Sequence, residues 1–286
     1  MIHKIDSKTA KQITDILRQC EATEVVRDDL TDKIRNLDTK RPCLIAISGE
    51  SGSGKSTLMA QIKKFLPQAT YLTTDNYFKD FSQEIQLHGS FDALLAAGYN
   101  MQAPFSIHLD ILRQNLTDLK QGKDVFIPEH LLNETGVTVL NKIPVKASDV
   151  VFVDGFCTLY EGVRDLFDFS VYLRADDKWH QEMFIKMQNE RNIPTDQATR
   201  IFKILSVSSE IYIKPTMQYA DCVLNVYHKD TESTIYQIIR LLMPKTPEEL
   251  LLQKLKNPVG DLAVLWSAIS DKTKQKILDE LNKNCG

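Results

Sequence analysis

The chain has 286 residues, a net charge of −3 and an apolar fraction of 43%. A chain of this length can fold as one large α/β domain with an appendage, or as two small domains. The charge balance offers no basic surface for nucleic acid or anionic lipid, and no apolar run reaches the ~18 residues of a membrane span. The five cysteines are odd in number and lack C-x-x-C spacing, so we expect reduced thiols in a cytoplasmic protein.

Residues 1–41 are predicted to be a helical segment in front of the main domain. Apolar residues near helical spacing are Ile5, Ile13, Ile16 and Leu17. Pro42 ends the segment just before an apolar run that reads as a strand. We expect this segment to pack against the sheet without a role in catalysis.

The most informative stretch is 44–57, LIAISGESGSGKST, which fits G-x-x-x-x-G-K-[ST], the phosphate-binding P-loop. Leu44–Ser48 is predicted as a buried parallel strand and Leu58–Leu66 as part of the following helix. Glycines let the backbone N–H groups curl around a phosphate, and the helix points its positive end at the same anion. The predicted nucleotide-binding residues are Gly49, Ser51, Gly52, Ser53, Gly54, Lys55, Ser56 and Thr57.

Within this loop two side chains have specific predicted roles. Lys55 adds a full positive charge for the β- and γ-phosphates, and Ser56 offers its hydroxyl to Mg²⁺. The helical spacing after the loop and the apolar strand before it both favour a nucleotide site over a chance match.

An acidic segment follows the next predicted strand, Ala69–Thr73, in the run DNYFKD. The carboxyl ends of parallel strands lie at one edge of the sheet, where ligands bind in open α/β folds. Two interpretations of Asp75 compete. It caps a short helix, or it accepts the proton of an attacking hydroxyl or helps to hold Mg²⁺. Its position relative to the P-loop favours the second interpretation.

A second carboxylate ends the apolar strand in Asp149–Gly155, DVVFVDG. This resembles the Walker B arrangement, in which an acid at a strand end reaches Mg²⁺ directly or through water. The alternative is a surface aspartate in a turn. The strand context favours the metal site, so Ser56 and Asp154 are the predicted metal ligands.

Candidate acceptor-binding groups lie between these motifs. Val125–His130 and Val137–Val145 are β-rich runs around a turn, which predicts a hairpin and a candidate substrate flap. His130 is a candidate for contact with a substrate hydroxyl, although a lone histidine is more often a structural group. Aromatic residues that either line a pocket or belong to the core are Phe91, Tyr99 and Phe105.

A lid is predicted beyond the next parallel strand, Phe169–Leu173. Asp176–Arg191 has a helical pattern and carries Lys178, Lys186 and Arg191. Basic groups in this position close over the transferred phosphoryl group and neutralise its charge. Arg191 is the strongest candidate, the alternative being a solvated charge.

The last third of the chain is predicted to complete the sheet and then turn helical. A long helix at Thr195–Tyr212 precedes the strand 219–226, which is expected to close the parallel sheet. The predicted C-terminal helices are Ile235–Met243, Pro247–Leu255, Leu262–Ile269 and Lys274–Leu281. The chain thus divides into a helical segment at 1–41, a main domain at 42–230 and a helical appendage at 231–286.

Five motifs follow one another over roughly residues 40–228: GESGSGKST, DNYFKD, VVFVDG, EGVRDLFDFSVYL and YIKPTMQYADCVLN. Their order and spacing resemble the uridine kinase/phosphoribulokinase family of small-molecule kinases, and the uridine kinase branch most of all. The resemblance implies an α/β P-loop NTPase fold. This is a three-layer sandwich with a mostly parallel central sheet, a β-hairpin flap and, here, a C-terminal helical appendage.

The resemblance also implies transfer of the ATP γ-phosphate to a hydroxyl of a small-molecule acceptor, with ATP and Mg²⁺ bound. Asp75 matches the family acid that receives the hydroxyl proton, and Tyr77 and Phe78 match the aromatic positions near the acceptor. The predicted catalytic residues are Asp75, Lys55 and Arg191. The predicted acceptor-binding residues are Tyr77, Phe78, Phe105 and His130.

The chain departs from the family where the acceptor is recognised. The stretch 100–108, NMQAPFSIH, lacks the family's carboxylates, and 131–135, LLNET, takes the place of a His-Ser-Arg flap signature. The lid helix keeps one Arg and one Lys near its end, and Asp154 stands where the branch usually has Glu. Phosphate binding is therefore expected to be intact and acceptor recognition altered.

Three functions stay open at this point. The first is a kinase of a uridine- or cytidine-like nucleoside or a related metabolite, and the second is a kinase of a sugar phosphate, pantothenate or glycerate. A phosphorylated acceptor needs extra basic residues near the flap, and the sequence has few there. The third is a nucleotide-binding regulatory protein with little kinase activity. The sequence leaves open the choice between ATP and GTP and whether the chain forms a homo-oligomer.

Overall fold

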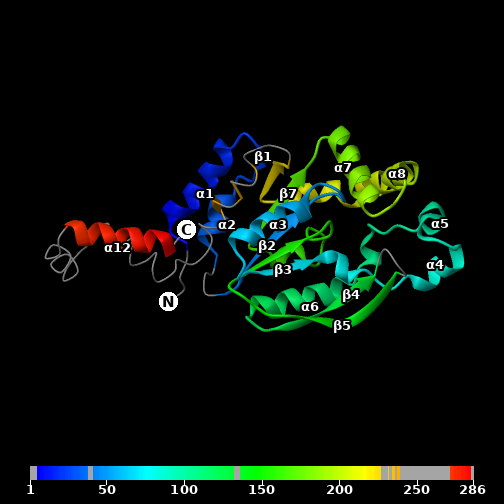
Figure 1. Ribbon diagram of the computed structural model, residues 1–286, viewed down its shortest axis with the longest axis horizontal. Coiled ribbons are helices and arrows are strands. Elements are labelled where there is room, and N and C mark those ends of the chain that lie inside the picture. Colours follow the sequence, from blue (N-terminus) through cyan, green and yellow to red (C-terminus); the bar gives the residue numbers. More distant parts are fainter. Residues whose placement is uncertain are drawn as a thin grey trace. The chain divides into compact units, whose positions relative to one another are not determined.

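The computed structural model describes residues 5–37, 41–131, 136–226, 231, 234–235, 237–238 and 271–284. Contacts divide the chain into two units, Met1–Leu242 and Met243–Gly286. The first unit holds a six-stranded sheet in the order β1-β8-β7-β2-β6-β3 and a separate β4–β5 hairpin (Figure 1). The described part of the second unit is the helix α12 (Asp271–Asn284).

Five parallel strands form the centre of the first unit. They are β2 (Cys43–Ser48), β3 (Thr70–Thr73), β6 (Val150–Asp154), β7 (Phe169–Arg174) and β8 (Cys222–Asn225). Residues of β2, β6 and β7 are almost all buried, as expected for parallel strands covered on both faces. Ile47 of β2 and Thr73 of β3 both pair with Asp154 of β6. The ends of these three strands therefore meet at one edge of the sheet.

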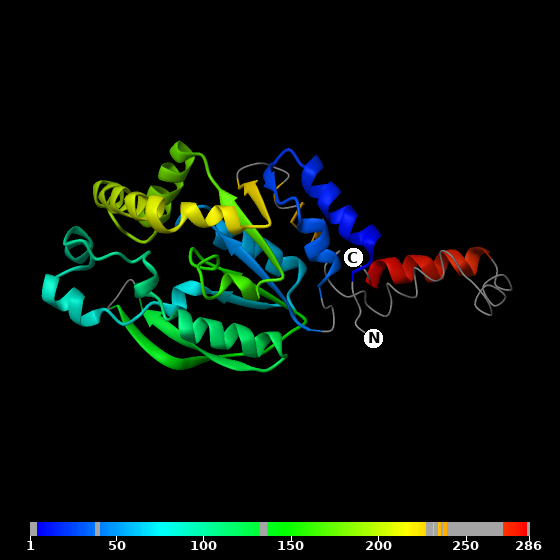
Figure 2. The same ribbon diagram turned by 180° about the vertical axis from the view of Figure 1, so that it is seen from behind.

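Helices cover both faces of this sheet, and the predicted three-layer α/β fold is confirmed. In both ribbon views α6 and the hairpin lie on one side of the sheet, and α7 and α8 on the other (Figures 1 and 2). The main helices are α3 (Lys55–Phe65), α6 (Leu109–Lys120), α7 (Asp177–Glu190) and α8 (Thr195–Tyr212). Shorter elements are η1 (Thr74–Tyr77), α4 (Ser82–His88), α5 (Phe91–Ala96), η2 (Pro104–Ser106), η3 (Arg164–Leu166) and η4 (Lys214–Tyr219).

The N-terminal segment is only partly helical. It contains α1 (Ser7–Gln19) and α2 (Leu30–Arg35), but Thr23–Val26 forms the strand β1, antiparallel to β8. The prediction of a wholly helical segment is wrong there. The expected strand at 219–226 is confirmed as β8, which is the outermost parallel strand of the sheet, and β1 adds an antiparallel strand beyond it. Three of the four residues of β1 are β-branched, which favours a strand. The helical spacing of the isoleucines upstream gave no indication of it.

The predicted hairpin is confirmed as β4 (Val125–Leu131) and β5 (Val137–Val145), an antiparallel pair. Residues 132–135 of its turn lie outside the described residues. Thr138 joins the hairpin to the segment after η1. Its hydroxyl donates to the Phe78 carbonyl oxygen at 2.8 Å, and its backbone N–H donates to Asp80 Oδ2 at 3.2 Å.

The C-terminal predictions are only partly covered by the described residues. Lys274–Leu281 lies within α12, and Ile235 and Ile238 are helical and buried. The predicted helices Pro247–Leu255 and Leu262–Ile269, and most of Ile235–Met243, lie outside the described residues. Among the helices that are described, none has the length and apolar character needed to cross a membrane.

A buried carboxylate ties the N-terminal segment to the sheet. Asp221 is fully buried, and its Oδ2 accepts hydrogen bonds from Lys33 Nζ at 2.6 Å and from Ser170 N at 2.8 Å. The Ser170 hydroxyl donates to the same oxygen at 2.9 Å. Lys33 belongs to α2 and Ser170 to β7, so this carboxylate holds three parts of the fold together.

We expect Asp221→Asn to lower the free energy of unfolding by about 3 kcal/mol, because the change leaves Lys33 without its buried partner. Urea denaturation followed by circular dichroism measures this. The control is Asp196→Asn, whose partner Arg200 and whose own side chain are both largely exposed. The Asp196–Arg200 ion pair should contribute nothing measurable to the free energy of unfolding. Equal effects of the two substitutions would contradict the role given to Asp221.

Candidate active site

The P-loop connects β2 to α3 and leaves the start of α3 open to an anion. Gly54 is the N-cap residue, with a φ of 83° that favours glycine, and α3 begins at Lys55. Neither a capping side chain nor an acidic residue occupies the first turn, so its N–H groups remain available for a phosphate. Lys55 Nζ donates to the carbonyl oxygens of Gly49 at 2.8 Å and Glu50 at 2.7 Å. Burial lowers the pKa of Lys55, and the nearby carboxylates oppose this.

Asp154 ends β6 and is buried, with 7% of its surface exposed. Burial raises its pKa to about 6, against the opposing effect of Lys55, and the neighbouring Asp75 raises it further. The interpretation of Asp154 as a surface residue in a turn is therefore wrong. The structure places this carboxylate at the end of β6, between β2 and β3, at the centre of the sheet edge.

Asp75 lies in η1, two residues beyond β3. The N-cap of η1 is Thr73, whose hydroxyl accepts from Asp75 N at 3.4 Å, so the interpretation of Asp75 as the capping residue is wrong. The Asp75 side chain is open to solvent within a cavity. The surrounding protein nevertheless desolvates it and raises its pKa, while Lys55 and Arg191 lower it.

Gly155 allows the two acidic segments to come together. Its φ is 149°, and a Cβ atom on this residue would lie 1.7 Å from Thr74 Oγ1. No side chain fits in that space, so the chain can leave β6 beside η1 only with glycine here. The close approach brings Asp154 beside the segment that carries Asp75.

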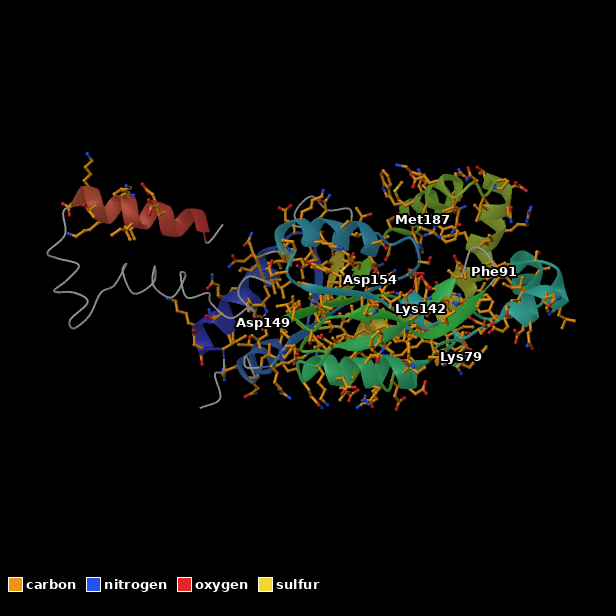
Figure 3. All side chains as sticks on the ribbon, turned by 60° about the horizontal axis from the view of Figure 1, so that its bottom comes forward. Lys79, Phe91, Lys142, Asp149, Asp154 and Met187 are labelled. Atoms are coloured by element: carbon orange, nitrogen blue, oxygen red, sulfur yellow. The ribbon has the colours of Figure 1, made fainter. Side chains whose placement is uncertain are left out.

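A cavity of ≈ 430 Å³ lies next to these acids. Asp75, Asp154 and the P-loop form its charged side. Its apolar wall consists of Phe78, Phe91, Met101, Phe156, Met187, Ile193, Ile201 and Leu205. Figure 3 labels Phe91, Asp154 and Met187, which reach this cavity from α5, β6 and α7. Further polar groups of the lining are Gln102, Gln188, Arg191 and Gln197.

A second cavity, of ≈ 620 Å³, is lined by the first turn of α3, by α7 and by Val226. It includes Lys186, the second basic residue of the predicted lid. The residues that line both cavities are Gly52, Lys55, Ser56, Met187 and Arg191. These residues therefore form the border between the two cavities.

Arg191 is held at this border by the end of α7. Asn192 has a φ of 63°, and its N–H donates to Asn189 O at 3.0 Å, while Ile193 N donates to Gln188 O at 3.0 Å. These two bonds form the Schellman motif that ends many helices. The motif fixes the backbone of Arg191, whose side chain is exposed at both cavities.

The predicted nucleotide-binding residues divide among the two cavities. Ser51 lines the ≈ 430 Å³ cavity, Gly54 and Thr57 line the ≈ 620 Å³ cavity, and Gly52, Lys55 and Ser56 line both. Gly49 and Ser53 line neither of them. Ser53 is buried behind the loop, where it lies against Gly49.

Of the predicted acceptor-binding residues, Phe78 is the one that the structure places in a cavity wall. Tyr77 is fully buried, and its hydroxyl accepts from Asn115 Nδ2 at 3.0 Å. Phe105 is 57% exposed and packs on Tyr99, with ring centroids 6.1 Å apart. Neither Tyr77 nor Phe105 lines the cavity beside Asp75.

His130 stands behind Phe78 and outside the cavity lining. Its ring centroid lies 5.2 Å from that of Phe78, and its Nδ1 is 2.6 Å from Thr138 Oγ1. Burial lowers the pKa of His130 to about 4, so the ring is neutral near pH 7. His130 therefore packs behind Phe78, which lines the cavity, and does not line the cavity itself.

The other described residues of the hairpin do not line this cavity either.

The glutamines of the cavity wall were not found by sequence reasoning. Gln102 is 4% exposed, and its Oε1 has no hydrogen-bond partner within the described part of the chain. The available signal was the stretch 100–108, where the family's carboxylates are missing. Gln188 and Gln197 gave no signal, because each joins the wall through the packing of α7 and α8.

Comparison with known proteins gives the same assignment as the motifs. The model of the Phosphoribulokinase / Uridine kinase family matches residues 44–232. The chain is 32% identical over 191 residues to the uridine kinase of Staphylococcus aureus (strain JH9), which covers 65% of this chain and 88% of that relative.

Solved structures with a similar fold include a possible uridine kinase from Bacillus stearothermophilus. It has 19% identity and a TM-score of 0.45, and the match covers 75% of this chain and all of the other. Phosphoribulokinase from Rhodobacter spheroides has 15% identity and a TM-score of 0.46, over 64% and 68% of the two chains. On the family model and the sequence relative, the chain belongs to the Phosphoribulokinase / Uridine kinase family.

Proposed function

We propose that this protein transfers the γ-phosphate of ATP to a hydroxyl group of a nucleoside or a similar uncharged metabolite. The observation that carries the proposal is the shared border of the two cavities. Lys55, Ser56 and Arg191 line both cavities, whereas Asp75 lines only the ≈ 430 Å³ cavity. A phosphoryl group at this border would be in reach of a donor on one side and an acceptor on the other.

The ≈ 620 Å³ cavity suits the nucleotide. It contains the start of α3, with its open N–H groups, and the basic residues Lys55, Lys186 and Arg191. Mg²⁺ commonly takes one or two protein oxygens together with phosphate oxygens and water. Ser56 and Asp154 both line the ≈ 430 Å³ cavity, and their side-chain oxygens fit this requirement. When bound, the metal would neutralise phosphate charge.

In the proposed reaction the acceptor oxygen attacks the γ-phosphorus, and the bond from that phosphorus to the β–γ bridging oxygen breaks. Asp75 takes the proton of the acceptor hydroxyl, and the bridging electrons leave with ADP. The raised pKa of Asp75 makes it a better proton acceptor than an ordinary aspartate. Lys55 and Arg191 offset the charge of the transferred group.

The acceptor cavity favours an uncharged molecule with an apolar face. Among its described lining residues the basic side chains are Lys55 and Arg191, and both lie at the border with the nucleotide cavity. The described lining therefore offers no further basic residue to bind a phosphate group already present on the acceptor. Aromatic and aliphatic walls suit a ring, and the glutamines suit its polar edge. The name of the Staphylococcus aureus relative, uridine kinase, supports a nucleoside.

The decisive experiment incubates the protein with ATP, Mg²⁺ and a mixed metabolite pool and identifies the phosphorylated product by mass. We expect one neutral hydroxyl compound to gain a phosphoryl group. ATP hydrolysis with no phosphorylated metabolite would instead indicate a regulatory nucleotide-binding protein. A product formed from a sugar phosphate would contradict the uncharged acceptor.

We expect Asp75→Asn to lower kcat by about 10²- to 10⁴-fold, because the amide cannot take the hydroxyl proton. The affinity for ATP should stay within a factor of two or so, since Asp75 lines only the acceptor cavity. Steady-state kinetics and ATP titration calorimetry measure the two quantities. Retained turnover, or loss of ATP binding, would remove Asp75 from the proposed role.

Asp154→Asn is expected to stabilise the free protein and to weaken ATP binding in the presence of Mg²⁺. Its carboxyl has a pKa of about 6 in the folded protein against a model value of 3.8. The ionised form therefore opposes folding by about 3 kcal/mol above pH ~6, and this penalty disappears as the pH falls toward 4. The thermal midpoint of Asp154→Asn should exceed that of the wild type at pH 8 and match it at pH 4.

The control is Asp149→Asn, at the opposite end of the same apolar run; Figure 3 labels both aspartates. Asp149 is exposed and lines neither cavity, so its substitution should change neither quantity. A lower thermal midpoint for Asp154→Asn at pH 8 would contradict the cost assigned to its burial.

Gln102→Leu should raise the KM for the acceptor about tenfold and leave the KM for ATP unchanged, because a hydrogen bond to the acceptor is lost. Gln114→Leu on the exposed face of α6 is the control and should change neither constant. Once the acceptor is known, steady-state kinetics with each substrate varied in turn give both values. An unchanged acceptor KM would show that Gln102 does not contact the acceptor.

A further inference from the structure

The P-loop is hydrogen-bonded to α7 through a residue that the proposed reaction does not use. His180 lies in the first turn of α7 and is 5% exposed. Its Nε2 lies 2.6 Å from the carbonyl oxygen of Ser51. A carbonyl oxygen only accepts, so Nε2 carries a hydrogen and donates it. The ring also packs edge-to-face on Phe202 of α8, with centroids 5.1 Å apart.

The preceding loop residue is held by α8. Glu50 is 7% exposed, and its Oε1 accepts a hydrogen bond from the Ser209 hydroxyl at 2.6 Å. Its other carboxylate oxygen lies 4.0 Å from His180 Nδ1, which is too long for a direct hydrogen bond. Two successive residues of the loop are thus each bonded to a different helix, Glu50 to α8 and Ser51 to α7.

The next residue of the loop lies directly against the backbone of α7. A Cβ atom on Gly52 would lie 3.2 Å from the Phe184 Cβ and 3.3 Å from its Cα. Phe184 is one turn beyond His180 and is 1% exposed. Two consecutive turns of α7 therefore lie against Ser51 and Gly52, so the first half of α7 is part of the frame around the loop.

We propose that His180, supported by Ser209, is a positioning residue that sets the P-loop for nucleotide binding. The peptide between Ser51 and Gly52 is trans and planar, so its C=O and N–H point in opposite directions. Because His180 holds the carbonyl, the Gly52 N–H is directed away from α7. That N–H has no acceptor within the described residues, and Gly52 lines both cavities. The hydrogen bond from His180 thereby presents a donor to a phosphate.

This arrangement gives α7 two functional ends. His180 fixes the loop near the start of the helix, and Arg191 reaches the cavity border just beyond its end. At a rise of about 1.5 Å per residue the two positions are roughly 16 Å apart along the axis. A movement that carries Arg191 toward the nucleotide must therefore pivot about the His180 end or take the loop with it.

The test measures the Kd of Mg·ATP by titration calorimetry without any acceptor. It rests on the ATP site of the proposed function, but not on the identity of the acceptor. His180→Phe keeps an aromatic ring against Phe202 and removes the donor, and His180→Gln restores a side-chain N–H. Ser209→Ala removes the second bond. Ser206→Ala is its matched control, because the Ser206 hydroxyl donates to Phe202 O at 2.8 Å within α8.

We expect His180→Phe to raise the Kd about tenfold, Ser209→Ala about threefold, and His180→Gln less than about threefold. Ser206→Ala should leave the Kd unchanged. Rescue by Gln separates positioning of the loop from loss of packing. A folded His180→Phe variant with the wild-type Kd would overturn the inference.

If His180→Phe does not fold, as judged by circular dichroism, the two serine variants decide the question. Equal Kd values for Ser209→Ala and Ser206→Ala overturn the inference, and a selective increase for Ser209→Ala supports it. Failure of the wild type to bind Mg·ATP would instead refute the donor site of the proposed function. The two failures are therefore distinguishable.

Discussion

The candidate site depends on one constraint, the parallel pairing of β6 between β2 and β3. In this register Asp154 stands beside both Ile47 and Thr73, so the strand that leads to the P-loop and the strand that leads to Asp75 end on either side of it. A slip of one residue would turn Asp154 to the opposite face of the sheet. Gly155 then lets the chain pass Thr74 at a distance that no side chain permits. The spacing of the P-loop, the proposed metal ligand Asp154 and the proposed proton acceptor Asp75 is therefore set by strand pairing, whereas the flanking helices supply the walls of the cavities.

Burial acts on the charged groups of this site in opposite directions. It raises the pKa values of Asp75 and Asp154 and lowers that of Lys55, because each charged form loses hydration. The opposite charges of Lys55 and the two acids offset part of this cost. A site in which desolvation and attraction are balanced in this way responds strongly to added charge, as binding of a metal and phosphates would provide. The same balance explains why a substitution that removes a charge here, such as Asp154→Asn, should raise the stability of the free protein while it weakens ligand binding.

The sequence predicted the parts of the site that local patterns determine. Lys55, Asp75 and Asp154 each come after a predicted parallel strand, and the ends of such strands meet at one edge of the sheet, so their proximity was foreseeable. Arg191 was found because it ends a helix beyond another such strand. Tyr77, Phe105 and His130 were predicted to bind the acceptor but do not line the cavity beside Asp75, because whether an aromatic residue faces a cavity or the core depends on which distant element covers it. Neighbouring residues show this, since Tyr77 meets Asn115 of α6 while Phe78 faces the cavity. His180 acts on a residue 129 positions away, and no local pattern reports such a contact.

The border between the two cavities has a consequence for inhibition. Five residues belong to the lining of both cavities, so the two spaces adjoin at Lys55 and Arg191. One molecule that joins a nucleotide to an acceptor analogue through a chain of phosphates could occupy both spaces at once. Such a bisubstrate ligand meets the second cavity at a high effective concentration once the first is filled. The number of phosphates in the linker then becomes a ruler, because the tightest-binding compound reports the distance between the base of the nucleotide and the attacking hydroxyl.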